Sequence, residues 1–238
     1  MIDYFSLGHP LARLRSHYAL TARKRMLKMF LDVFQPTGAQ TVLDLGATPD
    51  SSLPESNFFE QLYPFPDQVT AASIEDLAPL ALRFPKVRCV RFDGRSLPFA
   101  DRSFDLLFCS AVIEHVGTRE QQRLFVHEAL RVAKAFMFTT PNRLFPIEMH
   151  TLLPLLHWLP QSQHQALLRA IGKSFWAETS NLNLLTAGTL RSLFPPSQLT
   201  IRSVTVLGWP SNLIAYGQNQ EATCGGRGAL PPWQSEAR

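Results

Sequence analysis

The stretch Thr41-Val-Leu-Asp-Leu-Gly-Ala-Thr-Pro49 decides the fold. It is a short apolar run that carries one acid, Asp44, and ends at Gly46. This pattern is typical of a buried strand followed by a loop that approaches a nucleotide-like ligand. Glycine suits such a loop because the backbone must turn sharply and come close to the ligand without a Cβ. The pattern alone is weak evidence, since an apolar run with one acid and a glycine also arises by chance.

The sequence around this stretch alternates between strand-like and helix-like patterns. Apolar residues at helical spacing predict a helix over 10–34, which Pro36 and Gly38 end, and a second helix is expected over 119–133. Short apolar runs predict strands over 41–45, 69–72, 87–91, 104–109 and 135–139, with two more near 198–206 and 211–216. Strands separated by helices predict a parallel sheet with helices on both faces.

The domain organisation follows from length and local composition. We expect one domain over 1–220, since 238 residues suit a single core, and a disordered tail over 221–238, which is rich in glycine and proline. The segment 141–193 is longer than a crossover needs and poor in charge. It is predicted to be an inserted lid or acceptor-binding segment.

Composition excludes several classes of protein. A net charge of +4 is mild, and the basic residues near the start have the spacing of a solvated helix face, so no nucleic-acid partner is expected. Three scattered cysteines give no disulfide framework or zinc site. No signal peptide and no run long enough to span a bilayer are evident, so we expect a soluble, cytoplasmic protein.

Three further motifs follow the first strand in a specific order. They are Val90-Arg-Phe-Asp-Gly94, Leu97-Pro-Phe-Ala-Asp-Arg-Ser-Phe-Asp105 and Cys109-Ser-Ala-Val-Ile-Glu-His-Val116. With the first stretch, they resemble the class I S-adenosylmethionine-dependent methyltransferases of the type 11 and ubiquinone-biosynthesis kind, over about residues 38–142. The resemblance implies a seven-stranded, mostly parallel Rossmann-like sheet whose last strand is antiparallel, and S-adenosylmethionine as the cofactor.

The resemblance also assigns cofactor-binding positions. It implies that the loop from Asp44 through Thr48 faces the methionine end of the cofactor and that Ser110 lies under the sulfonium. Asp93 and Gly94 would lie beside the adenine, with the acid accepting from its amine. The predicted cofactor-binding residues are Asp44, Gly46, Thr48, Glu75, Asp93, Gly94 and Ser110.

Two positions depart from the family pattern. The usual G-x-G-x-G is Gly46-Ala-Thr-Pro-Asp50, with one glycine. The acid that usually ends the second strand and binds the ribose is replaced by Ser73, so Glu75 is predicted to take that role from the following turn. These departures leave open an alternative function, a non-catalytic binding protein with a methyltransferase fold.

The predicted catalytic residues are Glu114 and His115. An imidazole titrates near neutrality and can remove a proton from an acceptor hydroxyl. Some related O-methyltransferases bind a divalent metal through Glu-x-x-Glu-His, but the first position is Ala111 here. We therefore expect no metal site, although Glu148 or His150 could complete one. The competing interpretation of the Glu114-His115 pair is that Glu114 is an acid at the start of a helix and that His115 packs beneath the cofactor.

The acceptor is predicted to contact Asn142, Glu148 and His150. The segment from Phe145 to His150, together with His157 and Trp158, combines aromatic, acidic and imidazole groups, and such a mixture suits a partly apolar ligand. The expected function is methyl transfer to a small-molecule or lipid-linked acceptor, at oxygen. A methyltransferase acting on RNA or protein is disfavoured because no motif for flipped-base amines is present. An NAD-dependent oxidoreductase is disfavoured because the glycine loop does not fit the G-x-G-x-x-G spacing. The sequence does not predict an oligomeric state.

Overall fold

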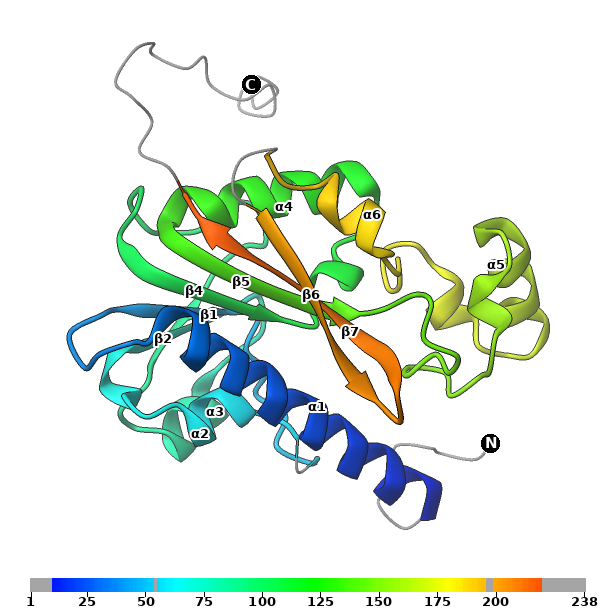
Figure 1. The fold of residues 1–238 in the computed structure, drawn as a ribbon, viewed down its shortest axis with the longest axis horizontal. Helices are drawn as coiled ribbons and strands as arrows, with labels where there is room; N and C mark the ends of the chain where they lie inside the picture. The colour runs from blue at the N-terminus through cyan, green and yellow to red at the C-terminus, as the bar shows by residue number, and fades with distance from the viewer. Residues whose placement is uncertain (1–9, 54, 196–198, 220–238) are drawn as a thin grey trace.

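The computed structural model describes residues 10–53, 55–195 and 199–219, and the tail predicted over 221–238 lies outside them. Its seven strands form one sheet in the order β3-β2-β1-β4-β5-β7-β6 (Figure 1). The strands are β1 (Val42–Leu45), β2 (Val69–Ser73), β3 (Arg88–Arg91), β4 (Phe104–Ser110), β5 (Ala133–Pro141), β6 (Leu199–Val206) and β7 (Trp209–Gln218).

The strand directions confirm the predicted sheet. Neighbouring strands from β3 through β5 pair in parallel, whereas β7 pairs antiparallel with both β5 and β6. The seven-stranded, mostly parallel Rossmann-like fold with an antiparallel last strand is therefore confirmed. One boundary was wrong: Ala133 begins β5 directly after a helix that was expected to include it, because no turn residues separate the two elements.

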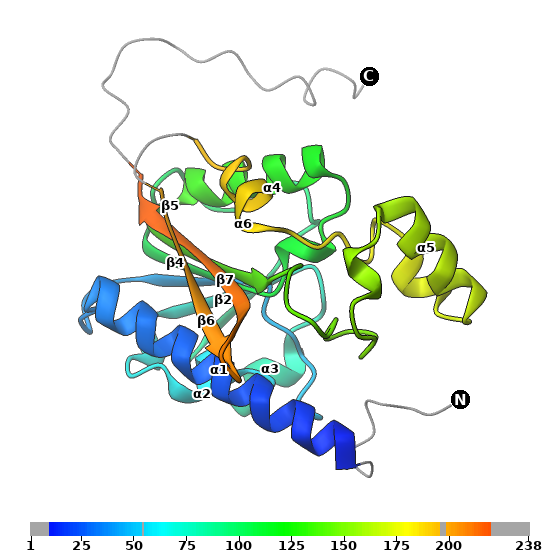
Figure 2. The ribbon, with the colours of Figure 1, turned by 45° about the vertical axis from the view of Figure 1, so that its right-hand side comes forward.

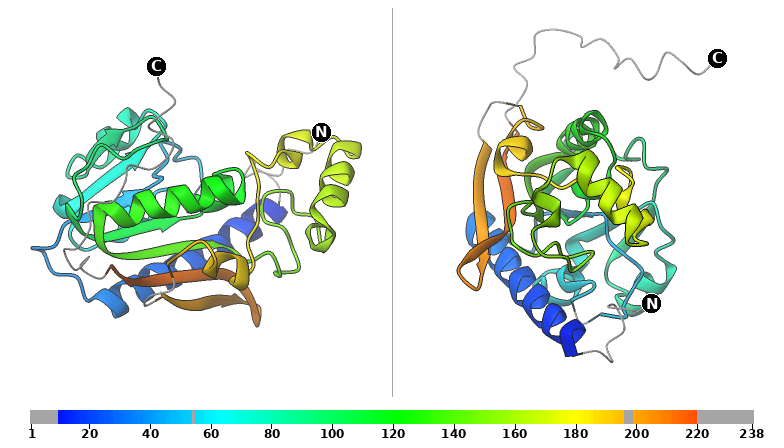
Figure 3. Two further views of the ribbon diagram at one scale, coloured as in Figure 1. Left: turned by 90° about the horizontal axis from the view of Figure 1, so that it is seen from above. Right: turned by 90° about the vertical axis from the view of Figure 1, so that its right-hand side faces the viewer.

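Helices lie on both faces of the sheet (Figure 3). The helices are α1 (Pro10–Phe34), α2 (Phe58–Leu62), α3 (Ala78–Arg83), α4 (Arg119–Val132), α5 (Gln161–Ala170) and α6 (Ala187–Arg191). Short 3-10 turns are η1 (Pro66–Gln68), η2 (Ile113–His115), η3 (Leu156–Trp158) and η4 (Ser174–Ala177).

Two hydrophobic cores separate these helices from the sheet. Because side chains alternate along a strand, Phe108 of β4 faces one core and its neighbour Leu107 faces the other. Phe30 of α1 and Phe59 of α2 pack on Phe108, with ring centroids 5.4 and 4.6 Å away. On the opposite face, α4 and α6 bury side chains that include Val126.

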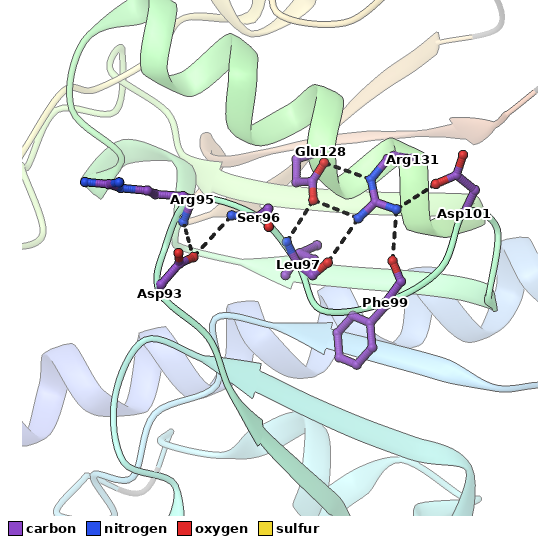
Figure 4. Close-up of polar contacts among 8 residues, drawn as sticks. All are labelled: Asp93, Arg95, Ser96, Leu97, Phe99, Asp101, Glu128 and Arg131. Atoms are coloured by element: carbon purple, nitrogen blue, oxygen red, sulfur yellow. Dashed lines mark hydrogen bonds and ion pairs between the residues drawn. The ribbon is translucent and has the colours of Figure 1, made fainter. Parts of the chain in front are cut away.

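The loop between β3 and β4 is fixed to α4 by hydrogen bonds (Figure 4). The Glu128 carboxylate accepts from the Leu97 N–H at 2.8 Å, and the Arg131 guanidinium donates to the carbonyls of Leu97 and Phe99 and pairs with Asp101 at 2.6 Å. Glu128 and Arg131 of α4 therefore hold the backbone of the loop that leads into β4.

The segment after β5 leaves the sheet and then returns to it. Its helix α5 projects from the side of the sheet (Figures 1 and 2), whereas α6 packs on the sheet and buries Leu190. Within the described ranges, no helix has the length and apolar character needed to cross a membrane.

Candidate active site

The predicted cofactor residues lie after four neighbouring strands. Gly46 follows β1, Glu75 follows β2, Asp93 and Gly94 follow β3, and Ser110 ends β4. These strands are parallel neighbours in the order β3-β2-β1-β4, so their carboxyl ends meet at one edge of the sheet. Ligands of open α/β sheets bind at this edge.

The turn after β1 requires a glycine. Gly46 has φ +94°, and its N–H donates to the Ala72 carbonyl at 2.7 Å. A Cβ at this position would collide with the Val112 side chain. Close packing of this turn against Val112 therefore explains the one retained glycine.

Asp44 is buried beside a second acid, Glu60 of α2. Burial raises the pKa of Asp44 well above its usual range, and the Glu60 carboxyl raises it further through charge and a hydrogen bond. Burial also raises the pKa of Glu60, although its hydrogen bond with Asp44 acts in the opposite direction. Both shifts favour the protonated form of this pair at the start of the predicted cofactor loop.

The single-glycine loop is held by its own polar groups. The Asn57 side-chain amide donates to the Thr48 carbonyl at 2.6 Å, and the Thr48 hydroxyl accepts from the Asp50 N–H at 3.2 Å. That Thr48 binds the cofactor stays a prediction.

The predicted adenine and ribose positions are exposed. Asp93, Gly94 and Glu75 are all exposed, and one carboxylate oxygen of Asp93 accepts from the N–H groups of Arg95 and Ser96 (Figure 4). These two bonds lower the pKa of Asp93, so it is ionised at neutral pH. Its remaining oxygen is the one that an adenine amine would contact.

Ile74 was missed by the sequence analysis. It is 59% exposed directly after β2, and a Cβ on Gly94 would lie 3.2 Å from its side chain. An exposed aliphatic side chain beside Asp93 and Gly94 offers an apolar surface for a flat base. An apolar residue directly after the small and polar end of a predicted strand is the sequence signal that could have identified it.

Ser110 contacts the neighbouring strand. Its hydroxyl lies 2.9 Å from that of Thr139 in β5, its register partner. Ala111, the next residue, has φ +57° and its N–H donates to the Thr139 carbonyl at 2.8 Å. The chain therefore turns away from the sheet directly after the position predicted to lie under the sulfonium.

Glu114 is fully buried in the turn η2. One carboxylate oxygen accepts from the Thr140 hydroxyl at 2.9 Å, while Oε1 has no hydrogen-bond partner among the described residues. A buried carboxylate oxygen without a donor is costly unless a cation or proton reaches it. Glu114 lies in the first turn of η2, where the competing interpretation expects a helix-start acid, and it is buried there.

His115 lies beside this oxygen. Its Nε2 is 3.9 Å from Glu114 Oε1, and its Nδ1 is 2.6 Å from the Asn181 carbonyl oxygen. A carbonyl oxygen can only accept, so this contact requires that Nδ1 carries the hydrogen. In the neutral ring, Nε2 is then the nitrogen that can accept a proton. The His115 side chain is 35% exposed.

The segment after β5 brings two further predicted residues to this place. His150 Nδ1 lies 2.6 Å from Glu148 Oε1, and the ring centroids of His150 and His115 are 4.9 Å apart. Trp176 packs against His150 at 4.9 Å. The structure thus joins four predicted residues, although their chemical roles stay predictions.

Asn142 lies apart from this group. Its side-chain amide donates to the Pro210 carbonyl at 2.9 Å, and its side-chain oxygen accepts from the Leu144 N–H at 3.0 Å. These bonds attach the start of the insert to β7, and the predicted contact between Asn142 and the acceptor stays untested.

Three of these side chains have the arrangement of metal ligands. Ligand atoms of Glu114, His115 and His150 all lie within 4.8 Å of one another. Each imidazole uses Nδ1 for an oxygen partner, which is the outer contact that usually orients a ligating histidine. The unpartnered Glu114 oxygen and two imidazoles therefore fit a divalent ion, although no metal site was predicted from the sequence.

Comparisons with known proteins agree with this geometry. Residues 57–135 match a family model described as a methyltransferase domain. The sequence has no match among curated proteins.

Solved structures share the fold at low sequence identity. A chain of the complex between the Haloferax volcanii Trm112 methyltransferase activator and a methyltransferase is 12% identical, with a TM-score of 0.54 over 91% of this chain and 96% of that one. The PH0226 protein from Pyrococcus horikoshii is 16% identical, with a TM-score of 0.53 over 92% and 96%. N-methyltransferase NodS from Bradyrhizobium japonicum is 14% identical, with a TM-score of 0.51 over 86% and 97%.

Residues 57–135 thus match a methyltransferase domain, and the sheet that contains them has the fold of the class I S-adenosylmethionine-dependent methyltransferases that the sequence resembles. S-adenosylmethionine is the cofactor of this class.

Proposed function

We propose that the protein methylates a hydroxyl oxygen of its acceptor and that His115 is the general base. The contact between His115 Nδ1 and the Asn181 carbonyl carries this proposal. It fixes the neutral tautomer in which Nε2 can accept a proton, and the partly exposed ring lies close to the carboxyl end of β4.

The chemistry asks little else of the protein. Bound S-adenosylmethionine supplies an activated methyl group, so the site must align the acceptor oxygen and remove its proton. Nε2 of His115 would take that proton, and the Glu114 carboxylate at 3.9 Å would stabilise the imidazolium that forms. Burial of Glu114 strengthens this interaction because little water screens it.

A second candidate role for the same side chains is to hold a divalent ion. Glu114, His115 and His150 would be its ligands, with Glu148 and the Asn181 carbonyl orienting the two imidazoles. An ion there would lower the pKa of an acceptor hydroxyl and replace the general base. The unpartnered buried oxygen of Glu114 is the observation that favours this candidate.

The first experiment titrates the protein with S-adenosylmethionine and S-adenosylhomocysteine by calorimetry. We expect micromolar binding of both, and no binding at millimolar ligand would favour the non-catalytic alternative. Release of S-adenosylhomocysteine is then measured with hydroxyl-bearing acceptors for the wild type, His115→Gln and His127→Gln. His127 is an exposed histidine on α4 and serves as the matched control.

His115→Gln should lower turnover about a hundredfold or more while cofactor affinity stays the same. An unchanged turnover in His115→Gln would refute the base assignment. A loss of cofactor affinity in this variant would assign the ring to binding instead.

A further inference from the structure

An apolar cavity of about 290 Å³ lies between α1, the insert and the β6–β7 hairpin. Its size is close to the lower end of the range for small-molecule sites, roughly 300–1,000 Å³. The lining side chains that matter here are Ala19, Phe145, Ile147, Met149, Leu152 and Leu207.

The polar part of the cavity wall is small. It comprises Tyr18, Ser211 and Asn212, and the Ser211 hydroxyl is used within the hairpin, at 3.1 Å from the Val204 carbonyl and 3.0 Å from Asn212 Oδ1. A ligand part that enters this cavity is therefore held by apolar contact, which suits a hydrocarbon chain.

The cavity lies next to the candidate active site. Ile147 and Met149 line it, whereas the intervening Glu148 and the following His150 contact each other beside His115. A smaller cavity, lined by Asn142 and Glu148 among others, shares Ile147 and Met149 with the apolar one. An amphiphilic acceptor could therefore keep its chain on one side of this segment and its polar end on the other.

The tip of the β6–β7 hairpin exposes apolar side chains beside the cavity. Leu207 lines the cavity, is 74% exposed and has φ +52°, and Gly208 follows with φ +82°. Trp209 is 53% exposed. Asparagine, aspartate and glycine are the residues that ordinarily occupy left-handed positions, so a solvent-exposed leucine there is unfavourable on two counts.

Positive charge accompanies this apolar tip. The Arg25 guanidinium of α1 donates to the Thr205 carbonyl of β6, and both Arg25 and Lys24 are exposed. Exposed apolar tips flanked by cations are the features that bind an anionic membrane surface.

We propose that the cavity binds the hydrocarbon chain of a lipid acceptor, which the hairpin tip takes up from an anionic membrane surface. The polar end of this lipid would carry the hydroxyl presented to His115. This inference rests on the proposed function and names its substrate class.

The first test measures chain binding directly. Fluorescent dodecanoic acid is titrated into the wild type, Ala19→Trp, which fills the cavity, and Leu82→Gln, which alters a leucine 86% exposed on α3. We expect saturable binding that is at least about tenfold weaker in Ala19→Trp and unchanged in Leu82→Gln. Ile147→Asp, which places a charge on a half-exposed wall residue, should weaken binding similarly and covers the case that Ala19→Trp does not fold.

The second test measures membrane binding by flotation with phosphatidylcholine vesicles, with and without phosphatidylglycerol. The wild type should float with the anionic vesicles, and Leu207→Asn should lose most of this binding while remaining folded, because asparagine tolerates positive φ. The cavity assignment is overturned if the wild type does not bind the probe, or if Ala19→Trp and Ile147→Asp bind it as well as the wild type does. The membrane source is overturned if Leu207→Asn floats with the anionic vesicles as well as the wild type does. Neither readout needs cofactor or turnover, so a failed cofactor titration with intact probe binding would refute the proposed function instead.

Discussion

His150 Nδ1 lies 2.6 Å from Oε1 of Glu148, and this contact holds the segment after β5 against the turn after β4. Glu148 is buried, and its carboxylate also accepts from the N–H groups of His150 and Thr151. Burial alone would raise the pKa of Glu148, but its bonds with His150 and Thr151 outweigh burial and lower the pKa to about 2. The position of the His150 ring thus depends on an ionised Glu148.

Glu148→Gln should destabilise the protein by about 1–3 kcal/mol at neutral pH, because a charged hydrogen-bond acceptor is lost from a buried site. The Glu148 pKa is depressed in the folded state, so its stabilisation is complete above the usual value of 4.5 and declines as pH falls toward about 2. Urea unfolding across this range should show a weaker pH dependence in the variant. Glu178→Gln, which alters an exposed ion pair with Arg169, is the control and should change stability little. Identical pH profiles for Glu148→Gln and wild type would contradict this account.

Glu60→Gln should stabilise the apo protein at neutral and alkaline pH by about 1 kcal/mol, because it removes one acid from a buried pair. The pKa values of Asp44 and Glu60 are raised in the folded state. The contribution of this pair to stability is therefore most favourable at low pH and becomes less favourable as pH rises above the usual carboxyl range. Unfolding free energy measured against pH should decline less in Glu60→Gln than in the wild type. Glu120→Gln, on the exposed face of α4, is the matched control, and a steeper decline in Glu60→Gln would argue against the shared proton.

The sheet could be predicted because its strands are local apolar runs. Each of the seven predicted strand segments overlaps an observed strand, and the helix over 10–34 matches α1. Local patterns also placed Gly46 and Asp93 after their strands. Where no turn residue separates two elements, as between α4 and β5, the boundary was not readable.

The assembly of the candidate active site depends on long-range packing, which local patterns do not encode. Glu114 and His150 lie far apart in the sequence, and the insert that carries His150 has no regular hydrophobic period to fix its path. Asn181 contributes only a backbone carbonyl to His115, and such contacts leave no residue-type signal. The carboxyl pair of Asp44 and Glu60 was not predicted either, because it too forms by packing between two separate elements, β1 and α2.

Asp93→Asn separates two roles of this residue. Asparagine keeps an oxygen that can accept from the Arg95 and Ser96 N–H groups, so the loop should keep its shape, but its amide replaces the second acceptor oxygen. If adenine donates to Asp93, S-adenosylhomocysteine affinity should fall about tenfold or more by calorimetry. Asp101→Asn, in the same loop, should bind normally. Equal affinity of Asp93→Asn and wild type would show that Asp93 only holds the loop.

Manganese should stabilise the protein if Glu114, His115 and His150 bind a divalent ion. At an ion concentration about 100 times the dissociation constant, mass action adds about 2.7 kcal/mol to the unfolding free energy. The increase should vanish in His150→Ala, which removes one ligand, and persist in His127→Ala. Methyl transfer by the wild type should then stop on treatment with a chelator and return with manganese. An equal manganese effect in His150→Ala would rule out this ion site, and activity that survives the chelator would leave His115 as the base.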